Sequence, residues 1–198
     1  MSTLPRLIVA TRNPHKSAEI RSMLGDRFEV LDATDFPDFP AIEETGCTFL
    51  ENATLKAVGI SRHVGGWVLA DDSGLEVDAL GGAPGVWSSS FGGQEGNHAM
   101  NNARLLQEMT GISARRARFR CTMVLAQNGI AQADFCGTVE GSITASLRGT
   151  GGFGYDPLFI PEGYDHTFGE LDASVKNRLS HRARALQQAV SWLENPQI

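Results

Sequence analysis

Asp71 and Asp72 form an adjacent pair of carboxylates between the apolar run at residues 67–70 and the dipeptide Ser73-Gly74. The apolar run predicts a buried strand, and functional sites in α/β sheets gather where strands end. One carboxylate at such a strand end can coordinate a metal or activate water, while the other anchors the loop. An Asx-turn is the structural alternative, because Asp-Ser-Gly also favours a turn.

The segment Thr11-Arg12-Asn13-Pro14-His15-Lys16 lies between a predicted strand at residues 6–10 and a predicted helix. Asn13 is a typical N-cap, Pro14 suits the first helical position, and Gly25 ends the helical pattern. Unsatisfied N–H groups and the helix dipole at such a start attract anions, and the basic residues of the segment suit phosphate. A capped helix with solvated basic residues is the alternative.

The acidic pair Glu43-Glu44 precedes a helix that Thr48 and Glu51 would start as a capping box. This pair could give a metal its second carboxylate, since magnesium usually takes one or two carboxylates and completes its shell with phosphates and waters. Complementing the helix dipole is the simpler role, and both interpretations stay open at this point.

Glycines crowd the segment Gly149-Thr150-Gly151-Gly152-Phe153-Gly154, which matches the pattern G-x-G-x-x-G. The dinucleotide-binding fingerprint is rejected, because it needs a helix directly after the glycines, whereas Tyr155-Asp156-Pro157 leads into a predicted strand. So many glycines still indicate close backbone approach to another group, and Phe153 and Tyr155 could stack on a base. A turn of purely structural role is the alternative.

A last polar group, Ser180-His181-Arg182, stands near the start of the final predicted helix, with Lys176 upstream. His181 and Arg182 could donate hydrogen bonds to a carbonyl oxygen. Taken singly, they would more often be a helix-start histidine and a surface arginine.

The framework that must position these residues is predicted from the hydrophobic pattern. Asn128-Gly129 between two apolar runs is a strong hairpin signal. Crossover units together with a hairpin predict an α/β domain with a mixed sheet. No linker divides the chain, so we expect a single domain over residues 1–198. The further elements that we expect are strands at residues 119–126, 130–137 and 139–146 and helices at residues 97–109 and from about Ser180.

Charge and composition argue against a nucleic-acid polymer as a partner. Hydrophobic residues make up 41% of the 198 residues and charged residues 20%, as in ordinary globular proteins, and the net charge is −6. A nucleic-acid polymer is therefore not expected as a partner, since proteins that bind duplexes present a basic face. The run Arg115-Arg116-Ala117-Arg118-Phe119-Arg120 alternates in the manner of a strand with one solvated face.

The three cysteines are widely spaced and include no C-x-x-C pair, which favours neither a disulfide framework nor a zinc site. No segment reaches the apolar length of a membrane span, and the N-terminus lacks the apolar core of a signal peptide. We therefore expect a cytoplasmic protein without a membrane partner.

Taken in order, these motifs resemble those of the inosine triphosphate pyrophosphatase family, which removes non-standard purine nucleotides. The likeness runs from about Arg6 to Leu193, and the ordered set is far more specific than any one piece. The matching stretches are Thr11-Arg12-Asn13-Pro14-His15-Lys16, Glu43-Glu44-Thr45-Gly46, Phe49-Leu50-Glu51-Asn52-Ala53, Ala70-Asp71-Asp72-Ser73-Gly74-Leu75, residues 149–157 and Ser180-His181-Arg182.

The resemblance implies both a fold and a reaction. The fold would be two lobes on a long mixed β-sheet with flanking helices, with the active site in the cleft between the lobes. The enzyme would hydrolyse dITP, ITP or XTP, small-molecule nucleoside triphosphates, to the monophosphate and pyrophosphate. It would need Mg²⁺ and would form a homodimer.

The resemblance also implies residue roles. Asp72 would be the catalytic base or a metal ligand, Glu43 the second metal ligand, and Ser73 a contact to the substrate. The residues that would bind the triphosphate are Thr11, Arg12, Asn13, Pro14, His15, Lys16 and Lys56. The residues that would enclose the base or bind its edge are Phe153, Gly154, Tyr155, Asp156, Lys176, His181 and Arg182.

One departure from the family pattern follows Gly85, where Ser90 stands in the place of an expected arginine. Whatever that arginine contributes, at the cleft or at the dimer contact, is open in this chain. Two other functions remain as alternatives: a nucleotide-binding sensor without turnover, and a pyrophosphatase for modified pyrimidine nucleotides. A panel of substrates separates them.

Overall fold

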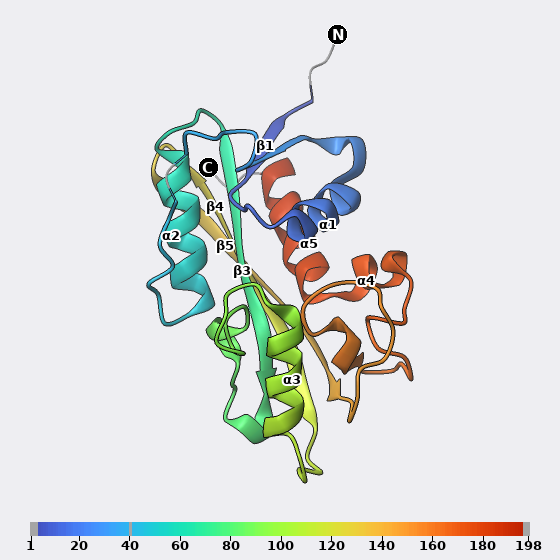
Figure 1. Ribbon diagram of the computed structural model, residues 1–198. Helices are drawn as coiled ribbons and strands as arrows, with labels where there is room; N and C mark the ends of the chain where they lie inside the picture. Colours follow the sequence, from blue (N-terminus) through green and yellow to red (C-terminus); the bar gives the residue numbers. More distant parts are fainter. Residues whose placement is uncertain (1–3, 40, 196–198) are drawn as a thin grey trace. The chain divides into compact units, whose positions relative to one another are not determined.

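The computed structural model describes residues 4–39 and 41–195 (Figure 1). Its described residues form a sheet with the strand order β2-β1-β3-β4-β5-β6. Strand β1 pairs in parallel with β2 and β3, whereas β5 pairs antiparallel with β6. The predicted mixed α/β fold is thereby confirmed. The strands are β1 (Arg6–Val9), β2 (Glu29–Asp32), β3 (Trp67–Val77), β4 (Arg116–Gln127), β5 (Ile130–Ile143) and β6 (Phe159–Pro161).

Five helices are found in the described part of the chain: α1 (Pro14–Leu24), α2 (Phe49–Ser61), α3 (His98–Glu108), α4 (Ala173–Leu179) and α5 (His181–Glu194). Two begin at N-caps that the sequence predicts, Asn13 and Thr48, and α3 begins at an N-cap, Asn97, that was expected only as the first residue of a helix. The side chains of Asn13 and Asn97 accept backbone N–H groups at the starts of α1 and α3, and Thr48 forms the capping box of α2 with Glu51. None of the described helices is long and apolar enough to cross a bilayer.

The chain divides into two compact units, each assembled from separate stretches of sequence. Unit 1 contains Met1–Asp72, Cys121–Gly137 and Ala183–Ile198, and unit 2 contains Ser73–Arg120 and Thr138–Arg182. Strands β3, β4 and β5 and helix α5 contribute residues to both units.

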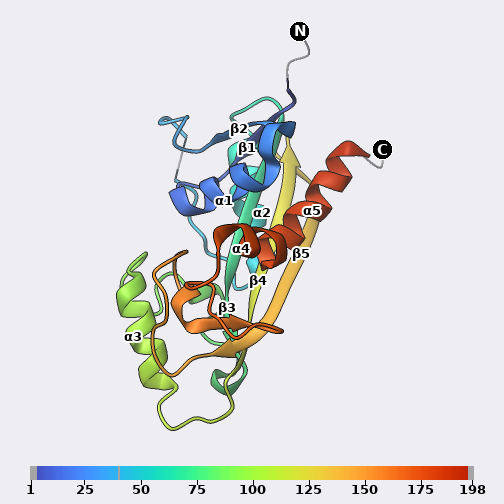
Figure 2. The same cartoon turned by 90° about the vertical axis from the view of Figure 1, so that its right-hand side faces the viewer.

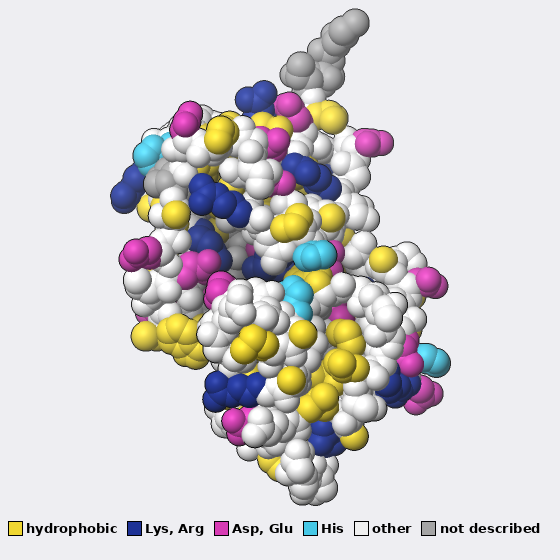
Figure 3. All heavy atoms as spheres, viewed as in Figure 1, with side chains coloured by type: hydrophobic (Ala, Val, Ile, Leu, Met, Phe, Trp, Pro, Cys, Tyr) yellow, Lys and Arg dark blue, Asp and Glu magenta, His cyan; other side chains and the backbone are white. Residues whose placement is uncertain are grey.

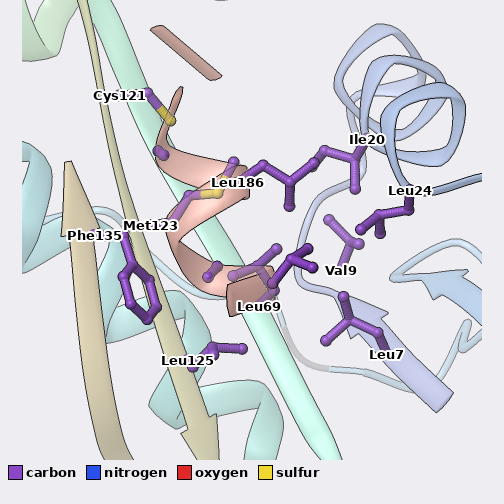
Figure 4. Close-up of a cluster of buried hydrophobic side chains, with 13 residues drawn as sticks. Leu7, Val9, Ile20, Leu24, Leu69, Cys121, Met123, Leu125, Phe135 and Leu186 are labelled. Atoms are coloured by element: carbon purple, nitrogen blue, oxygen red, sulfur yellow. The ribbon is translucent and has the colours of Figure 1, made fainter. Parts of the chain in front are cut away.

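Unit 1 is built on the alternation of side chains along its strands. Leu7 and Val9 of β1 point to one face of the sheet, where they pack with apolar residues of α1 and α5 (Figure 4). Ile8 points to the opposite face, where it packs against α2 through Ala53 and Ala57. Figure 1 shows α2 on one side of β3 and the helices α1 and α5 on the other. Unit 1 is therefore a three-layer arrangement of helix, sheet and helices.

Unit 2 has an aromatic core. Phe119 packs edge-on against Phe159 with ring centroids 4.7 Å apart, and Phe168 stacks on Phe159 at 5.4 Å. Helix α3 adds Leu105 to this core, and Met109, the residue that caps the end of α3, also belongs to it. The irregular stretch that follows β5, orange in Figure 2, lies beside α3. Tyr155, which follows the glycine-rich loop, belongs to this core, and Leu179 of α4 packs against it.

Two strand predictions are wrong, for related reasons. Strand β3 does not end before Asp71 but continues to Val77, so the acidic pair lies within a strand. Likewise, residues 139–146 are not a separate strand, because β5 continues without a break from Ile130 to Ile143. In both places polar residues and glycines interrupt the apolar pattern of the sequence. Pairing with neighbouring strands nevertheless keeps these residues in the strand. The hairpin itself is confirmed, since Asn128 and Gly129 both have positive φ, at 54° and 79°.

Arg116, Arg118 and Arg120 lie on one side of β4 in unit 2, and Ala117 and Phe119 between them are buried on the other. Arg118 contacts Asp78 at 2.9 Å and Glu140 at 2.9 Å, and Arg120 contacts Glu76 at 3.4 Å. These arginines therefore face acidic side chains on the adjoining strands rather than forming a bare basic patch, which confirms the expected solvated strand face. Acidic and basic side chains are also interspersed on the face seen in Figure 3.

Candidate functional site

Asp71 and Asp72 lie on opposite faces of β3, because consecutive residues of a strand alternate. Leu69, two residues before Asp71, belongs to the core on the α1 and α5 side, and Ala70, two residues before Asp72, belongs to the core on the α2 side. Asp71 accordingly meets a lysine of α1, and Asp72 meets a lysine of α2. The alternation gives two adjacent residues two different environments.

The first environment is the start of α1. Lys16 Nζ lies 3.0 Å from Asp71 Oδ2, and the Asp71 side chain is completely buried. Asn13 caps the helix, its Oδ1 accepting the N–H of His15 at 2.9 Å and that of Lys16 at 3.4 Å. Thr11 supports this turn, since its hydroxyl accepts the N–H of Asn13 at 3.1 Å. A positively charged lysine and a helix N-terminus thus converge, which favours an anionic ligand.

The second environment surrounds Asp72 in unit 1. Lys56 Nζ lies 3.5 Å from Asp72 Oδ1 and 2.6 Å from Glu44 Oε2. Asn52 donates through Nδ2 to Asp72 Oδ2 at 3.2 Å. Lys56 and Asn52 both come from α2, at a spacing of one helical turn, so the helix presents them together.

Burial and charge act against each other at these two side chains. Burial raises the pKa of Asp72 above its ordinary value, and the neighbouring charges of Lys56 and Lys16 only partly oppose that shift. Burial alone would lower the pKa of Lys56, but the carboxylates of Asp72, Asp71 and Glu44 outweigh it and raise that pKa. Lys56 therefore stays a cation at neutral pH, while Asp72 holds a proton more readily than an exposed aspartate does. A buried carboxylate with a raised pKa is a candidate for proton transfer.

In unit 2 the glycine-rich loop closes around Asp156. The Asp156 carboxylate accepts the N–H of Phe153 at 2.7 Å and the ammonium of Lys176 at 2.5 Å. Lys176 Nζ also lies 4.5 Å from the centroid of the Phe153 ring. Gly152 has φ +68°, and a Cβ there would lie 2.0 Å from Asp156 Oδ2, so the loop needs glycine at this position. The loop thus presents Phe153 in a defined position.

The other predicted residues of unit 2 are buried near this loop. Arg182 is 1% exposed, donates through Nη2 to Ser73 Oγ at 2.9 Å, and has its guanidinium 5.7 Å from the Phe153 ring centroid. His181 stacks on Phe119 with ring centroids 4.9 Å apart. Tyr155 is buried and donates its hydroxyl to the Ser88 carbonyl at 2.9 Å. Tyr155 therefore has a structural partner in this structure, whereas Phe153 is the more exposed ring.

The remaining predicted residues lie at the edges of these groups. Arg12 is exposed and donates to the Phe39 carbonyl at 2.8 Å, and Pro14 and His15 are exposed in the first turn of α1. Glu43 is exposed, and it is the next residue, Glu44, that contacts Lys56. Of the acidic pair, Glu44 therefore contacts the group around Asp72, and the role of Glu43 as a metal ligand stays a prediction.

Asn52 and Asn102, whose contacts sequence reasoning missed, hold predicted residues in place, and so does Glu44 of the acidic pair. Asn52 and Glu44 bond directly to Asp72 and Lys56, and the Asn102 side chain donates to the Gly154 carbonyl at 3.0 Å. Asn52 lies within a stretch that matches the family motif, but nothing in its type or spacing distinguishes it from a surface asparagine. Its pairing with Asp72 joins residues 20 positions apart and depends on the fold.

A metal ion would need oxygen ligands at this site. No group of three or more His, Cys, Asp or Glu side chains that could hold a metal occurs among the residues that the structure describes. Asp72 and Glu44 both place a carboxylate oxygen within 3.5 Å of Lys56 Nζ, which brings two hard oxygen donors to one cation. That donor set fits magnesium, which needs only one or two carboxylates when phosphate and water supply the other ligands.

Known proteins are similar to this chain over nearly its whole length. The model of the Ham1 family matches residues 7–192. A protein of Halalkalibacterium halodurans named dITP/XTP pyrophosphatase is 47% identical over 190 residues, covering 94% of this chain and 98% of that protein. A protein of Geobacter sulfurreducens with the same name is 48% identical over 186 residues, covering 92% of this chain and 94% of that protein.

A solved structure of a HAM1 protein from Coxiella burnetii has a TM-score of 0.86 to this chain at 38% identity, covering 96% of this chain and 99% of the other. The family match and the identity of the relatives extend over nearly the whole chain. The resemblance that the ordered motifs indicate is thereby confirmed, and the chain belongs to the Ham1 family.

Proposed function

We propose that this protein is a hydrolase that converts dITP, ITP and XTP to the corresponding monophosphate and pyrophosphate, and so cleanses the nucleotide pool. The observation that carries this proposal is the buried Asp72 carboxylate, held between Lys56 and Asn52 in the unit whose α1 N-terminus is suited to phosphate. The names of the relatives, dITP/XTP pyrophosphatase, support the choice of substrate.

In the proposed reaction a water molecule attacks the α-phosphorus, and the bond from that phosphorus to the oxygen bridging to the β-phosphorus breaks. Asp72 accepts the proton of the water. Pyrophosphate leaves with that bridging oxygen, and Lys16 and Lys56 stabilise its charge. In the structure these lysines contact Asp71, Asp72 and Glu44. We infer that phosphate oxygens replace those carboxylates as partners of the lysines when the nucleotide binds.

We further propose that the reaction requires Mg²⁺, held by Asp72 together with a carboxylate of the Glu43-Glu44 pair. When bound, the ion would neutralise phosphate charge and lower the pKa of the attacking water. The donor set around Lys56 supports this assignment.

We assign binding of the base to unit 2. Phe153, placed by Asp156, would stack on the purine, while His181 and Arg182 would donate to its 6-oxo group, with Lys176 beside the ring. Adenine carries an amino donor at that position, so two donors would face each other and one would stay unpaired. Unpaired buried groups of this kind cost on the order of several kcal/mol in discrimination.

The decisive assay incubates the protein with dITP and follows the products by anion-exchange chromatography, with and without Mg²⁺. We expect dIMP and pyrophosphate to appear together, turnover to stop with EDTA, and dATP to react far more slowly. Stepwise release of orthophosphate would rule out the pyrophosphatase mechanism. Binding of dITP without turnover would instead identify a sensor.

Two properties of the whole molecule belong to the same proposal. We propose a homodimer, as the resemblance implies, which light scattering of the purified protein tests. We also propose a cytoplasmic location. It is supported by the cysteines, since no disulfide joins any of them in the described chain.

A further inference from the structure

Asn52 makes two hydrogen bonds that fix the orientation of its amide. Its Nδ2 donates to Asp72 Oδ2 at 3.2 Å, and its Oδ1 accepts the N–H of Gly46 at 2.8 Å. Exchanging the oxygen and the nitrogen would set donor against donor and acceptor against acceptor, so only one amide orientation satisfies both contacts. The side chain is also buried, at 4% exposure, so water is a poor substitute for either partner.

The contact with Gly46 brings residues 43–46, which we call the acidic segment, close to the start of α2. A Cβ on Gly46 would lie 2.7 Å from Asn52 Oδ1 and 2.6 Å from Glu51 Cβ, so this close approach requires glycine. Two residues earlier, Glu44 reaches Lys56, and Lys56 reaches Asp72. Asn52, Asp72, Lys56 and Glu44 therefore form a ring of contacts that the backbone at Gly46 closes.

We propose that Asn52 is a positioning residue for Asp72, and that it ties the acidic segment to the reacting carboxylate; this rests on the function proposed above. By holding Asp72 Oδ2, Asn52 fixes the rotamer of the carboxylate and leaves Oδ1 on the side of Lys56. Loss of that hydrogen bond would let the carboxylate rotate away from the water it must deprotonate. The effect belongs on kcat, because the two hydrogen bonds of the Asn52 side chain go to Asp72 and to the Gly46 N–H, and to none of the residues assigned to triphosphate binding.

A purely structural role for Asn52 is the rival explanation, and unit 2 contains its matched control. Asn101 occupies the fourth position of α3, as Asn52 does in α2, and is also buried. Asn101 Oδ1 accepts the N–H of Gly92 at 2.6 Å, and its Nδ2 donates to the Ser89 carbonyl at 2.9 Å. The two asparagines differ in the acceptor of their Nδ2: a carboxylate for Asn52 and a backbone carbonyl for Asn101.

The test compares Asn52→Asp with Asn101→Asp. Each substitution keeps the acceptor for the glycine N–H and replaces the second contact by two oxygens that face each other. We expect both to lower the midpoint of thermal unfolding, but only Asn52→Asp to lower kcat for dITP, by roughly tenfold or more, with KM changed by less than about twofold. An unchanged kcat in Asn52→Asp, a loss in KM alone, or an equal loss of kcat in Asn101→Asp would overturn the proposal.

A reciprocal variant tests the contact without relying on turnover. Combining Asn52→Asp with Asp72→Asn restores a donor and an acceptor in reversed order. We expect the double variant to unfold at a higher temperature than Asn52→Asp alone, and its kcat to stay as low as that of Asp72→Asn. Additive thermal effects would show that the two side chains do not interact and would overturn the proposal. If the wild-type protein released no pyrophosphate, the proposed function would fail, while this thermal cycle would still decide whether Asn52 holds Asp72.

Discussion

Lys16 Nζ lies 3.0 Å from Asp71 Oδ2, on the face of β3 opposite to that from which Asp72 meets Lys56. The adjacent aspartates are therefore separate in structural terms, although they look like one motif in the sequence. Asp71 ties the start of α1 to the sheet, and Asp72 belongs to the group around α2. This division supports Asp72 as the reacting carboxylate and Asp71 as an anchor.

The two aspartates should respond differently to replacement by asparagine. Asp71→Asn leaves Lys16 without its buried partner, and we expect a loss of about 3 kcal/mol in the free energy of unfolding. Asp72→Asn removes a carboxylate whose pKa is raised by burial, so its stability at neutral pH should be unchanged or higher, while most turnover is lost. Urea unfolding and dITP turnover measure the two effects. Near-normal turnover in Asp72→Asn would remove Asp72 from its proposed role.

The glycine-rich loop should not tolerate a side chain at Gly152. Gly152→Ala places a Cβ against the Asp156 carboxylate that holds the Phe153 N–H, so we expect KM for dITP to rise severalfold or more. Gly163→Ala is the matched control, because Gly163 also has positive φ, at +83°, but a Cβ there meets nothing within 4 Å. The control should lose only about 1–3 kcal/mol of stability through backbone strain and keep its KM. Equal KM values in the two variants would contradict this role of the loop.

Local signals predicted the parts of this protein that local chemistry determines. The caps at Asn13 and Thr48 and the turn at Asn128-Gly129 depend on residues within one or two turns of each other, so the sequence pattern was sufficient. The end of β3 depends instead on its neighbours in the sheet, which the local pattern does not contain.

The candidate site shows the same limit. The residue types of the motifs indicated Asp72 and Lys16, and the family resemblance added Lys56, but neither showed which lysine faces which carboxylate. That pairing follows from strand alternation once Asp71 and Asp72 are inside β3. The contacts of Asn52 and Glu44 with this group were missed, because they come from folding of α2 and of residues 43–46 against the strand.

Asp32 should make stability depend on pH in the acidic range. Burial would raise its pKa, but hydrogen bonds from Thr34 and Ser17 and the charge of Arg21 outweigh burial and lower that pKa. The native state thus binds this proton less tightly than the unfolded state. The stabilisation is complete above the ordinary aspartate pKa, about 4, and is lost as the pH falls from there through the lowered native value.

Urea unfolding of wild type and Asp32→Asn at a series of pH values measures this contribution. We expect the difference in unfolding free energy between the two proteins to shrink as the pH falls below about 4. Thr34→Val removes the hydroxyl that donates to Asp32 Oδ1. The pH dependence of its unfolding free energy should lie between those of wild type and Asp32→Asn. A difference that stays constant with pH would show that Asp32 titrates alike in both states.

The arginines of β4 should contribute to stability rather than to function. Arg118 is 22% exposed and contacts Glu76, Asp78 and Glu140, so Arg118→Met leaves three carboxylates without their shared cation. We expect a loss of about 1–2 kcal/mol in the free energy of unfolding at low salt, shrinking as added salt screens the charges. Arg116→Met is the control, because Arg116 is 68% exposed and its contacts are longer, at 3.5 and 3.9 Å.

Because we assign these arginines a role in stability and not in function, turnover of dITP should be unchanged in Arg118→Met and in Arg116→Met. Fluorescence anisotropy with a labelled DNA duplex gives an independent measurement. We expect no binding by the wild-type protein at physiological salt, because the arginines already face carboxylates and the chain carries a net charge of −6. Duplex binding that Arg118→Met or Arg116→Met abolished would contradict the structural assignment and show that this strand face binds nucleic acid.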